Sequence, residues 1–244
     1  RGGGSAAPPR VTMRAFMNRS APCFRGDALV AMADGSQRRV DAVRKGDRVA
    51  VPAFDGHGMA VEGSAGASAS VACVVRTATT GGSTPLCKLP GGLIVTPYHP
   101  VHVDGAWRFP VDVAAPRLLP CEAVYSFVLA PAAATAAAAA AGAAASAVEV
   151  GGPGDADAAG KVRGGAMLIN GVPAVTMGHG MTDPAGTDAG AGNACVLSHP
   201  FYATSAVVDN MRRLAGWGAG LVRLEEGCAE RDAATGLIVR LHQR

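Results

Sequence analysis

The sequence predicts an all-β fold made of many short strands. Apolar residues occur in short runs with strand-like alternation, and several of these runs are separated by tight-turn pairs: Asp34-Gly35, Asp104-Gly105 and Asn170-Gly171. Both residues of such a pair tolerate the positive φ angles that a two-residue hairpin turn requires. Apolar residues at helical spacing occur in one short segment near the C-terminus, which predicts a single short helix there.

The predicted strands are, in chain order, residues 28–32, 40–43, 49–53, 71–77, 86–89, 93–96, 101–103, 107–109, 123–129, 166–169, 172–177, 221–224 and 237–241, with a strand-like stub at 195–197. The predicted helix runs from residue 205 to about 214, with Val207, Val208 and Met211 on one stripe. Thr204 is its predicted N-cap, because its hydroxyl can accept a bond from a free backbone N–H of the first turn.

One domain is predicted over residues 11–244. Residues 1–10 are rich in Gly, Ser, Ala and Pro and read as a flexible linker. Residues 11–22 carry Met13 and Phe16 and are expected to dock as an arm. Residues 131–160 are Ala-rich and are expected to form a mobile insertion, because Ala buries little area and cannot hold a helix onto the domain.

Charge and composition argue against nucleic-acid and membrane partners. The chain has 22 basic and 19 acidic residues, a net charge of +3, and only 5% aromatic residues. A nucleic-acid binder would need a basic patch or stacking platforms. The chain shows no signal peptide, and its Ala-rich stretch lacks the large apolar side chains of a transmembrane helix.

The six cysteines form no CxxC motif, so neither a zinc ribbon nor a redox pair is predicted. Most are expected to be buried free thiols, and pairing among Cys73, Cys87 and Cys121 stays open. A metal site on His99 and His102 would need a third ligand. No metal and no cofactor are predicted.

Cys23 is the candidate nucleophile, because it follows Pro22 at the point where strand-like sequence begins. A thiol is the side chain best able to attack a carbonyl near neutral pH. Attack on the carbonyl of Pro22 and loss of the Cys23 nitrogen would replace the amide with a thioester. The departing nitrogen needs a proton, so a general acid is required, and an oxyanion donor would help.

Thr96 and His99 are the candidate partners of Cys23. They follow a buried strand at 93–95, and prolines flank the turn that holds His99. His99 is expected to act as the acid, and Thr96 to donate to the same carbonyl or to orient the imidazole. His102 is expected to face away, being three residues further along a strand.

His179 and His199 are further candidates for activating water or a second nucleophile. His179 lies between Gly178 and Gly180, where unusual backbone angles are available. His199 precedes Pro200, which favours extended backbone. A structural role is an open alternative for both.

The chain resembles the Hint superfamily of hedgehog autoprocessing domains and inteins. The resemblance rests on Cys23-Phe24, Asp34-Gly35-Ser36, Gly46-Asp47-Arg48-Val49 and Thr96-Pro97-Tyr98-His99-Pro100. Further blocks, at residues 105–110, 124–129, 178–180 and 199–204, resemble the Vint branch, found beside von Willebrand type A domains.

The resemblance implies a horseshoe-shaped all-β fold with approximate two-fold symmetry. It also implies Cys23 as nucleophile, Thr96 and His99 as the Thr-x-x-His pair, and self-processing without a cofactor. The partner is then the chain's own N-terminal flank, with water or a small molecule as second nucleophile. The terminal His-Asn pair of inteins is missing, so N-terminal cleavage without splicing is expected.

Two other functions remain open at this point. The first is a catalytically silent Hint-fold binding or structural module, which the awkward acyl donor Pro22 and the missing His-Asn pair favour. The second is a cysteine hydrolase acting on another substrate, for which the sequence reveals neither a cleft nor an orienting third group.

Overall fold

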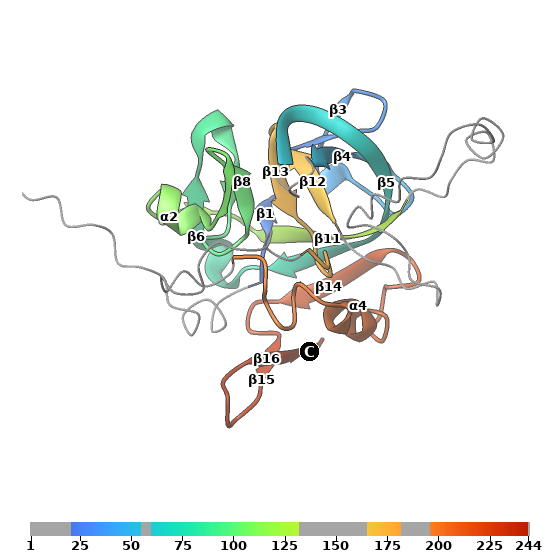
Figure 1. Ribbon diagram of the computed structural model, residues 1–244. Helices are drawn as coiled ribbons and strands as arrows, with labels where there is room; N and C mark the ends of the chain where they lie inside the picture. The colour runs from blue at the N-terminus through green and yellow to red at the C-terminus, as the bar shows by residue number, and fades with distance from the viewer. Residues whose placement is uncertain (1–20, 55–59, 132–164, 182–195, 244) are drawn as a thin grey trace, which may run out of the picture.

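The computed structural model describes residues 21–54, 60–131, 165–181 and 196–243 (Figure 1). The predicted linker at 1–10, residues 11–20 of the arm, residues 132–160 of the insertion and the loop at 183–192 lie outside the described residues. Within these ranges the protein is all-β with short helices, as predicted.

The larger sheet has eight strands in the order β10-β6-β7-β1-β11-β5-β14, with β4 paired to β5, as far as the structure describes the chain. Strand β5 is long and bends around one side of the molecule in Figure 1. The members of this sheet are β1 (Phe24–Arg25), β4 (Arg48–Phe54), β5 (Ala60–Ala78), β6 (Ser83–Lys88), β7 (Ile94–Val95), β10 (Arg117–Pro120), β11 (Ala123–Pro131) and β14 (Leu221–Glu225).

The second sheet has six strands in the order β3-β2-β12-β13-β8-β9 among the described residues. Its members are β2 (Leu29–Ala31), β3 (Gln37–Arg39), β8 (Val101–Val103), β9 (Ala106–Arg108), β12 (Ala166–Ile169) and β13 (Val172–Val175). A separate hairpin pairs β15 (Ala229–Arg231) with β16 (Ile238–Leu241). The helices are α2 (Pro110–Val113) and α4 (Ser205–Met211), with 3-10 turns η1 (Val40–Ala42), η2 (Thr80–Gly82) and η3 (Pro90–Gly92).

The main core joins the two sheets. Phe24 and Phe127 come from the larger sheet, Met167 and Ile169 from the smaller one, and all four are fully buried in one cluster. Burying side chains of this size contributes about 1.5–3 kcal/mol each. The core therefore anchors β1, and with it the residue just before β1, Cys23.

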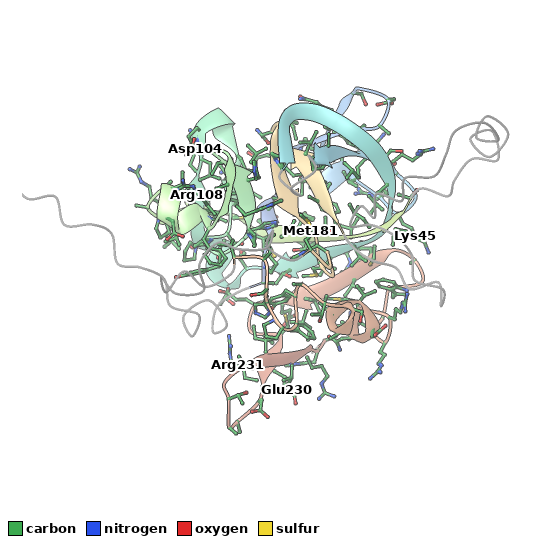
Figure 2. The ribbon with its side chains drawn as sticks, in the orientation of Figure 1. Lys45, Asp104, Arg108, Met181, Glu230 and Arg231 are labelled. Atoms are coloured by element: carbon green, nitrogen blue, oxygen red, sulfur yellow. The ribbon has the colours of Figure 1, made fainter. Side chains whose placement is uncertain are left out.

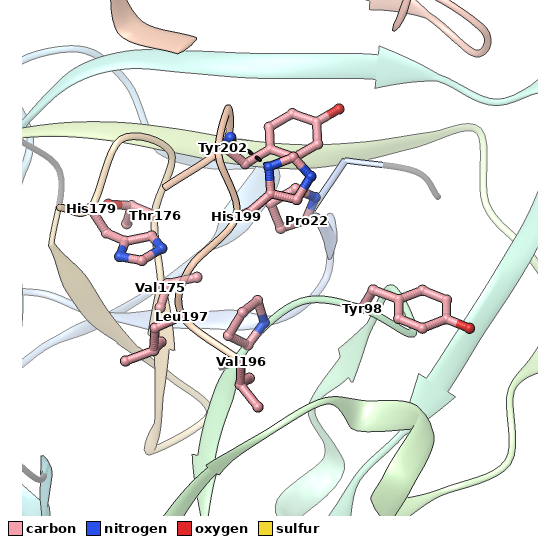
Figure 3. Close-up of a pocket in the computed structure, with 10 residues that line it drawn as sticks. Pro22, Tyr98, Val175, Thr176, His179, Val196, Leu197, His199 and Tyr202 are labelled. Atoms are coloured by element: carbon pink, nitrogen blue, oxygen red, sulfur yellow. Dashed lines mark hydrogen bonds between the residues drawn. The ribbon is translucent and has the colours of Figure 1, made fainter. Parts of the chain in front are cut away.

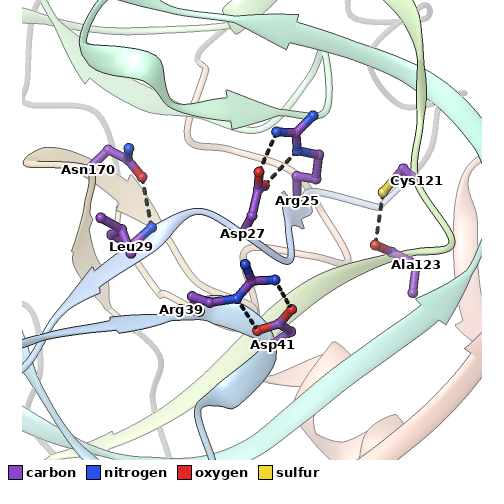
Figure 4. Close-up of polar contacts among 8 residues, drawn as sticks. All are labelled: Arg25, Asp27, Leu29, Arg39, Asp41, Cys121, Ala123 and Asn170. Atoms are coloured by element: carbon purple, nitrogen blue, oxygen red, sulfur yellow. Dashed lines mark hydrogen bonds and ion pairs between the residues drawn. The ribbon is translucent and has the colours of Figure 1, made fainter.

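Two of the three predicted two-residue hairpin turns are confirmed. The third, at Asp34-Gly35, is wrong, because only Gly35 has a positive φ, of 84°, and residues 32–36 together connect β2 to β3. Asp104 and Gly105 have φ angles of 51° and 71°, and Asn170 and Gly171 have 50° and 78°. These are the positive φ values of a two-residue hairpin turn. Asn170 also accepts a hydrogen bond from the Leu29 backbone at 2.8 Å, which links its turn to β2 (Figure 4).

The predicted strand at 40–43 is wrong, because this segment forms the 3-10 turn η1. Val40 and Val43 are both buried, and the Val43 N–H donates to the Val40 carbonyl at 3.3 Å. The spacing of three residues suits one 3-10 turn, whose side chains i and i+3 share a face. The partner of β2 is instead the exposed strand β3, tied back by the ion pair of Arg39 with Asp41 (Figure 4).

Several other segments differ from the prediction. The short strand predicted at 195–197 is wrong in its described part, because residues 196 and 197 lie in a turn. Helix α2 was not predicted; Pro110 starts it, and it is closed by the Ala114 N–H donating to the Pro110 carbonyl at 2.8 Å. Strands β10 and β15 were also not predicted, because most of their side chains are exposed and give no core-facing pattern.

Helix α4 lies near strand β14, the last strand of the larger sheet, and both contribute side chains to one buried cluster (Figure 1). The Thr204 hydroxyl accepts from the Ala206 N–H at 3.3 Å, so the predicted N-cap is confirmed. The helix ends at Met211 rather than 214, because the next residues continue as tighter turns. The β15–β16 hairpin, marked by Glu230 and Arg231 in Figure 2, follows β14 along the chain. Within the described ranges, no helix is both long and apolar enough to cross a membrane.

Candidate active site

Strand β1 determines which side chains surround Cys23. It lies between β7 and β11, with Phe24 opposite Val95 on one side and Tyr125 on the other. Cys23, one residue before Phe24, therefore lies between Thr96 and Ser126, the next residues along the two antiparallel neighbours. The cysteine is 2% exposed.

Thr96 holds the backbone on both sides of Cys23. Its hydroxyl oxygen accepts a hydrogen bond from the Cys23 N–H at 2.9 Å, and its own N–H donates to the Cys23 carbonyl at 2.9 Å. The hydroxyl hydrogen is directed to the Ala21 carbonyl at 3.3 Å. The structure thus brings Thr96 to the expected peptide linkage, but its hydroxyl binds the amide nitrogen rather than the Pro22 carbonyl or the imidazole.

His99 lies beside the same linkage and is buried. Its ring packs on Phe24 with centroids 4.2 Å apart, and Nε2 lies 2.9 Å from the Val175 carbonyl. A carbonyl can only accept, so Nε2 carries the hydrogen and Nδ1 has a free lone pair in the neutral ring. Nδ1 makes no hydrogen bond with the described residues.

Burial lowers the pKa of His99 to about 4, while the Val175 carbonyl and the Cys23 backbone favour the protonated ring and offset part of this effect. The imidazole is therefore neutral at pH 7. It can protonate the Cys23 nitrogen only after Nδ1 has first taken up a proton.

The thiol of Cys23 is also neutral at pH 7. The pKa of Cys23 is raised to about 12, mainly by burial and to a lesser extent by the neighbouring thiols of Cys228 and Cys121, while the contact with the Ser126 hydroxyl acts in the opposite direction. Cys23, Cys73, Cys87, Cys121 and Cys228 form no disulfide bond. The pairing among Cys73, Cys87 and Cys121 that the sequence left open does not occur.

Ser126 is the residue of this site that the sequence analysis did not identify. Its hydroxyl donates to the Pro22 carbonyl and lies 3.2 Å from the sulfur of Cys23. It is 2% exposed. The available signal was one hydroxyl in the otherwise apolar predicted strand at 123–129, but only the pairing of β1 with β11 shows what that hydroxyl faces.

His179 and His199 form a second group beside the linkage. Two backbone bonds join their loops: Gly178 N–H to the Tyr202 carbonyl, and Gly180 N–H to the Ala203 carbonyl, both 2.8 Å. Gly178 has φ +69°, and a Cβ there would lie 2.5 Å from a methyl group of Val208. Glycine is therefore required for the loop carrying His179 to approach helix α4.

Both rings of this group are held by backbone donors. The Met181 N–H donates to Nδ1 of His179 at 3.1 Å, and the Phe201 and Tyr202 N–H groups donate to Nδ1 of His199 at 3.1 and 3.0 Å. Burial lowers the pKa of His179 to about 3 and that of His199 to about 4. Both are neutral at pH 7 with the hydrogen on Nε2, the tautomer opposite to that of His99.

A small cavity connects this second group with the scissile linkage (Figure 3). Its volume is about 10 Å³, room for about one water molecule. The buried hydroxyl of Tyr202 has no hydrogen-bond partner within the described part of the chain. The lining residues are Pro22, Tyr98, Pro100, Val175, Thr176, His179, Val196, Leu197, His199 and Tyr202.

His102 lies apart from both groups. Its ring packs edge-on against Trp107, with centroids 5.4 Å apart. No three His, Cys, Asp or Glu side chains in the described ranges are grouped as metal ligands would be. The groups in contact with the linkage are the thiol of Cys23 and the hydroxyls of Thr96 and Ser126, with neutral imidazoles nearby.

An all-β fold with a cysteine before a central strand and a Thr-x-x-His pair at its backbone defines a Hint-type domain. The sequence matches the Vint family, described as a Hint domain, over residues 22–240. The chain belongs to the Vint family of Hint domains. No curated protein matches the chain.

Solved structures similar to this chain include inteins. A DnaB intein from Synechocystis sp. PCC 6803 is 13% identical, with a TM-score of 0.34, and the match covers 64% of this chain and 99% of the intein. The Ssp DnaB mini-intein variant M86 is 13% identical, with a TM-score of 0.36, over 65% of this chain and 96% of that one.

Proposed function

We propose that this Hint domain cleaves its own chain between Pro22 and Cys23 by an N–S acyl shift followed by hydrolysis, which releases the N-terminal flank without splicing. One observation carries the proposal. The Pro22–Cys23 peptide bond is bound on both sides, its oxygen by Ser126 and its nitrogen by Thr96, with the Cys23 thiol beside it. The reaction is a single-turnover event of the protein on itself.

In the first step the sulfur of Cys23 attacks the carbonyl carbon of Pro22. The attack closes a five-membered ring, because nucleophile and carbonyl belong to adjacent residues. Holding both groups in one geometry lowers the entropic part of the barrier. The bond from Ser126 polarises the carbonyl that is attacked.

In the second step the bond from the Pro22 carbonyl carbon to the Cys23 nitrogen breaks. Thr96 holds the hydrogen already present on this nitrogen, which leaves the other face of the nitrogen free to be protonated. The free lone pair of His99 Nδ1 takes the proton lost as the carbonyl re-forms and passes it to the nitrogen. With a pKa of about 4 the ring is neutral before the step and holds the proton only during the transfer.

In the third step water hydrolyses the thioester. The cavity beside Pro22 has room for about one water molecule, which favours hydrolysis over transfer to a bulky acceptor. The Nε2 hydrogens of His179 and His199 are suited to bind this water or the oxygen that gains charge. The products are a flank ending in the Pro22 carboxylate and a domain beginning at Cys23.

The asparagines of this sequence support the proposal of cleavage without splicing. Splicing of the intein kind ends on an Asn preceded by His, and neither Asn193 nor Asn210 has that neighbour. Asn210 lies in α4, and its side chain accepts a hydrogen bond from the Leu241 backbone at 2.8 Å. This arrangement supports a structural role for Asn210.

The test is a fusion of a folded reporter upstream of Arg1, followed by intact mass with and without hydroxylamine. The expected result is cleavage at Pro22–Cys23, faster with hydroxylamine, which converts the thioester to a hydroxamate. Cys23→Ala should remain uncut, and Cys73→Ala, which removes a buried thiol elsewhere, should behave as the parent. A folded parent whose mass never changes would refute the proposal.

A catalytically silent Hint-fold module is the second candidate. The observation that favours it is the burial of the Cys23 thiol, which raises its pKa to about 12 and leaves little thiolate at neutral pH. The same fusion separates the two candidates. The silent module gives a stable, uncut chain that does not react with hydroxylamine.

A further inference from the structure

Ser126 contacts both atoms between which a proton must move in the first step. Its hydroxyl donates to the oxygen of the Pro22 carbonyl, the atom that gains charge when the carbonyl is attacked. The same hydroxyl lies 3.2 Å from the sulfur of Cys23, the atom that attacks. The side chain is 2% exposed, so bulk water does not mediate these contacts.

A serine hydroxyl has one hydrogen to donate and lone pairs with which to accept. Because this hydrogen is directed to the Pro22 carbonyl, a second bond to Cys23 requires the thiol to be the donor. The thiol is protonated at neutral pH, since burial raises its pKa to about 12. The contacts therefore form a chain from the Cys23 S–H to the Ser126 oxygen and from the Ser126 O–H to the Pro22 oxygen.

We propose that Ser126 is a catalytic residue that carries the proton of the Cys23 thiol to the Pro22 carbonyl oxygen as the sulfur attacks. The proposal rests on the self-cleavage proposed above. The bond that forms joins sulfur to the carbonyl carbon, and the π pair of the carbonyl moves to its oxygen. That oxygen takes the Ser126 hydrogen, Ser126 takes the thiol hydrogen, and the product is a neutral S–C(OH)–N intermediate.

The advantage of this route is that no charged group forms in a buried site. Attack by a thiolate would require an isolated charge where water is excluded, first on sulfur and then on oxygen. In the relay, a proton moves from the sulfur to the carbonyl oxygen as electrons do, so neither atom becomes charged. The burial that disfavours a thiolate mechanism is therefore compatible with the reaction.

The other polar groups at the linkage are poorly placed for this transfer. The Thr96 hydroxyl is bonded to the Cys23 nitrogen and the Ala21 carbonyl. The neutral His99 ring has its hydrogen on Nε2, directed at Val175. Among the described residues, Ser126 is the hydroxyl with a contact to both the sulfur and the scissile oxygen.

The test compares Ser126→Ala with the parent in the hydroxylamine-driven cleavage of the reporter fusion. Removing the hydroxyl should slow cleavage by about 100- to 1,000-fold, the usual effect of losing one oxyanion donor. The pH profile should change as well. The parent rate should be nearly flat from pH 7 to 9, whereas the variant should speed up about tenfold per pH unit, because it must form thiolate first.

Other titratable groups surround Cys23, namely His99, Cys121, Tyr202 and Cys228. Burial raises the pKa of Cys121 and Tyr202 and lowers that of His99. The profile should therefore be repeated with Cys121→Ser and Cys228→Ser, and neither change should alter its shape.

Ser126→Thr keeps a hydroxyl and should recover most of the rate with a flat profile. It also provides a second variant if Ser126→Ala does not fold, which thermal melting would show. A folded Ser126→Ala that cleaves at the parent's rate with the parent's profile overturns the role of Ser126 and leaves self-cleavage intact. A parent that does not cleave overturns both proposals.

Discussion

The two histidine groups beside the Pro22–Cys23 linkage are both buried but differ in tautomer. His99 gives its Nε2 hydrogen to the Val175 carbonyl and leaves Nδ1 as an acceptor. His179 and His199 accept backbone N–H groups at Nδ1 and keep a hydrogen on Nε2. Because the backbone partner selects the tautomer, residues of one type can act as a proton acceptor in one group and as donors in the other.

The largest effect is expected from His99→Gln. The glutamine amide can still donate to the Val175 carbonyl, but it lacks the basic nitrogen that moves a proton to the Cys23 nitrogen. Both spontaneous and hydroxylamine-driven cleavage should fall by about 100- to 10,000-fold, the range for loss of a general acid–base group.

The matched control is His102→Gln, a buried histidine three residues away that packs on Trp107. Its cleavage, followed by gel densitometry of the reporter fusion, should equal that of the parent. Equal losses in the two variants would show that a buried imidazole in this region matters for packing rather than for proton transfer.

A smaller and more selective effect is expected from His179→Asn. The asparagine oxygen can accept from the Met181 N–H as Nδ1 does, but the Nε2 hydrogen of this cavity-lining ring is lost. Spontaneous hydrolysis should slow by about 10- to 100-fold, the cost of one hydrogen bond to a group that gains charge. Hydroxylamine-driven cleavage should stay at the parent's rate.

Mass spectrometry distinguishes the two outcomes. If the group of His179 and His199 serves the hydrolysis step alone, His179→Asn should accumulate a thioester that hydroxylamine resolves. A parallel loss of both reactions would instead assign His179 to the first step, or to the structure of the linkage.

The smallest effect per residue is expected on the free energy of unfolding in acid. The histidines of both groups contribute to this effect. The folded pKa of all three histidines is lowered, to about 4, 3 and 4 for His99, His179 and His199, from an ordinary value of 6.5. Below pH 6.5 the unfolded chain binds protons that the folded chain does not. Stability is therefore full above this pH and falls as the pH drops toward 4.

When the pH falls from 7 to 5, each histidine should lower the free energy of unfolding by about 1–2 kcal/mol. Urea unfolding at these two values measures the total. His99→Gln and His179→Asn should each reduce the difference, because each removes one group that takes up a proton on unfolding. Equal stability of the parent at pH 7 and pH 5 would contradict the neutral state of these rings.

Local sequence predicted the strands flanked by strong turn signals. The strand at 101–103 with its Asp104-Gly105 turn, and the strand at 166–169 with Asn170-Gly171, occur as predicted because these pairs adopt positive φ readily. The segment 40–43 was mispredicted because its two apolar positions fit either a strand or a 3-10 turn. Its packing against the core decides for the turn.

The sequence by itself determined the all-β class and the turns at Asp104-Gly105 and Asn170-Gly171, and it singled out Cys23, Thr96 and His99 as candidates, because these signals depend on residue types and local spacings. Tertiary structure alone decided the contacts of Ser126 with the Pro22 carbonyl and the Cys23 sulfur, the meeting of His179 with His199 and the tautomer of each imidazole. The reason is physical: the hydrogen-bond partners that define the reacting bond come from strands and loops more than 70 residues apart, as the separations of 73 for Cys23–Thr96 and 103 for Ser126–Cys23 show.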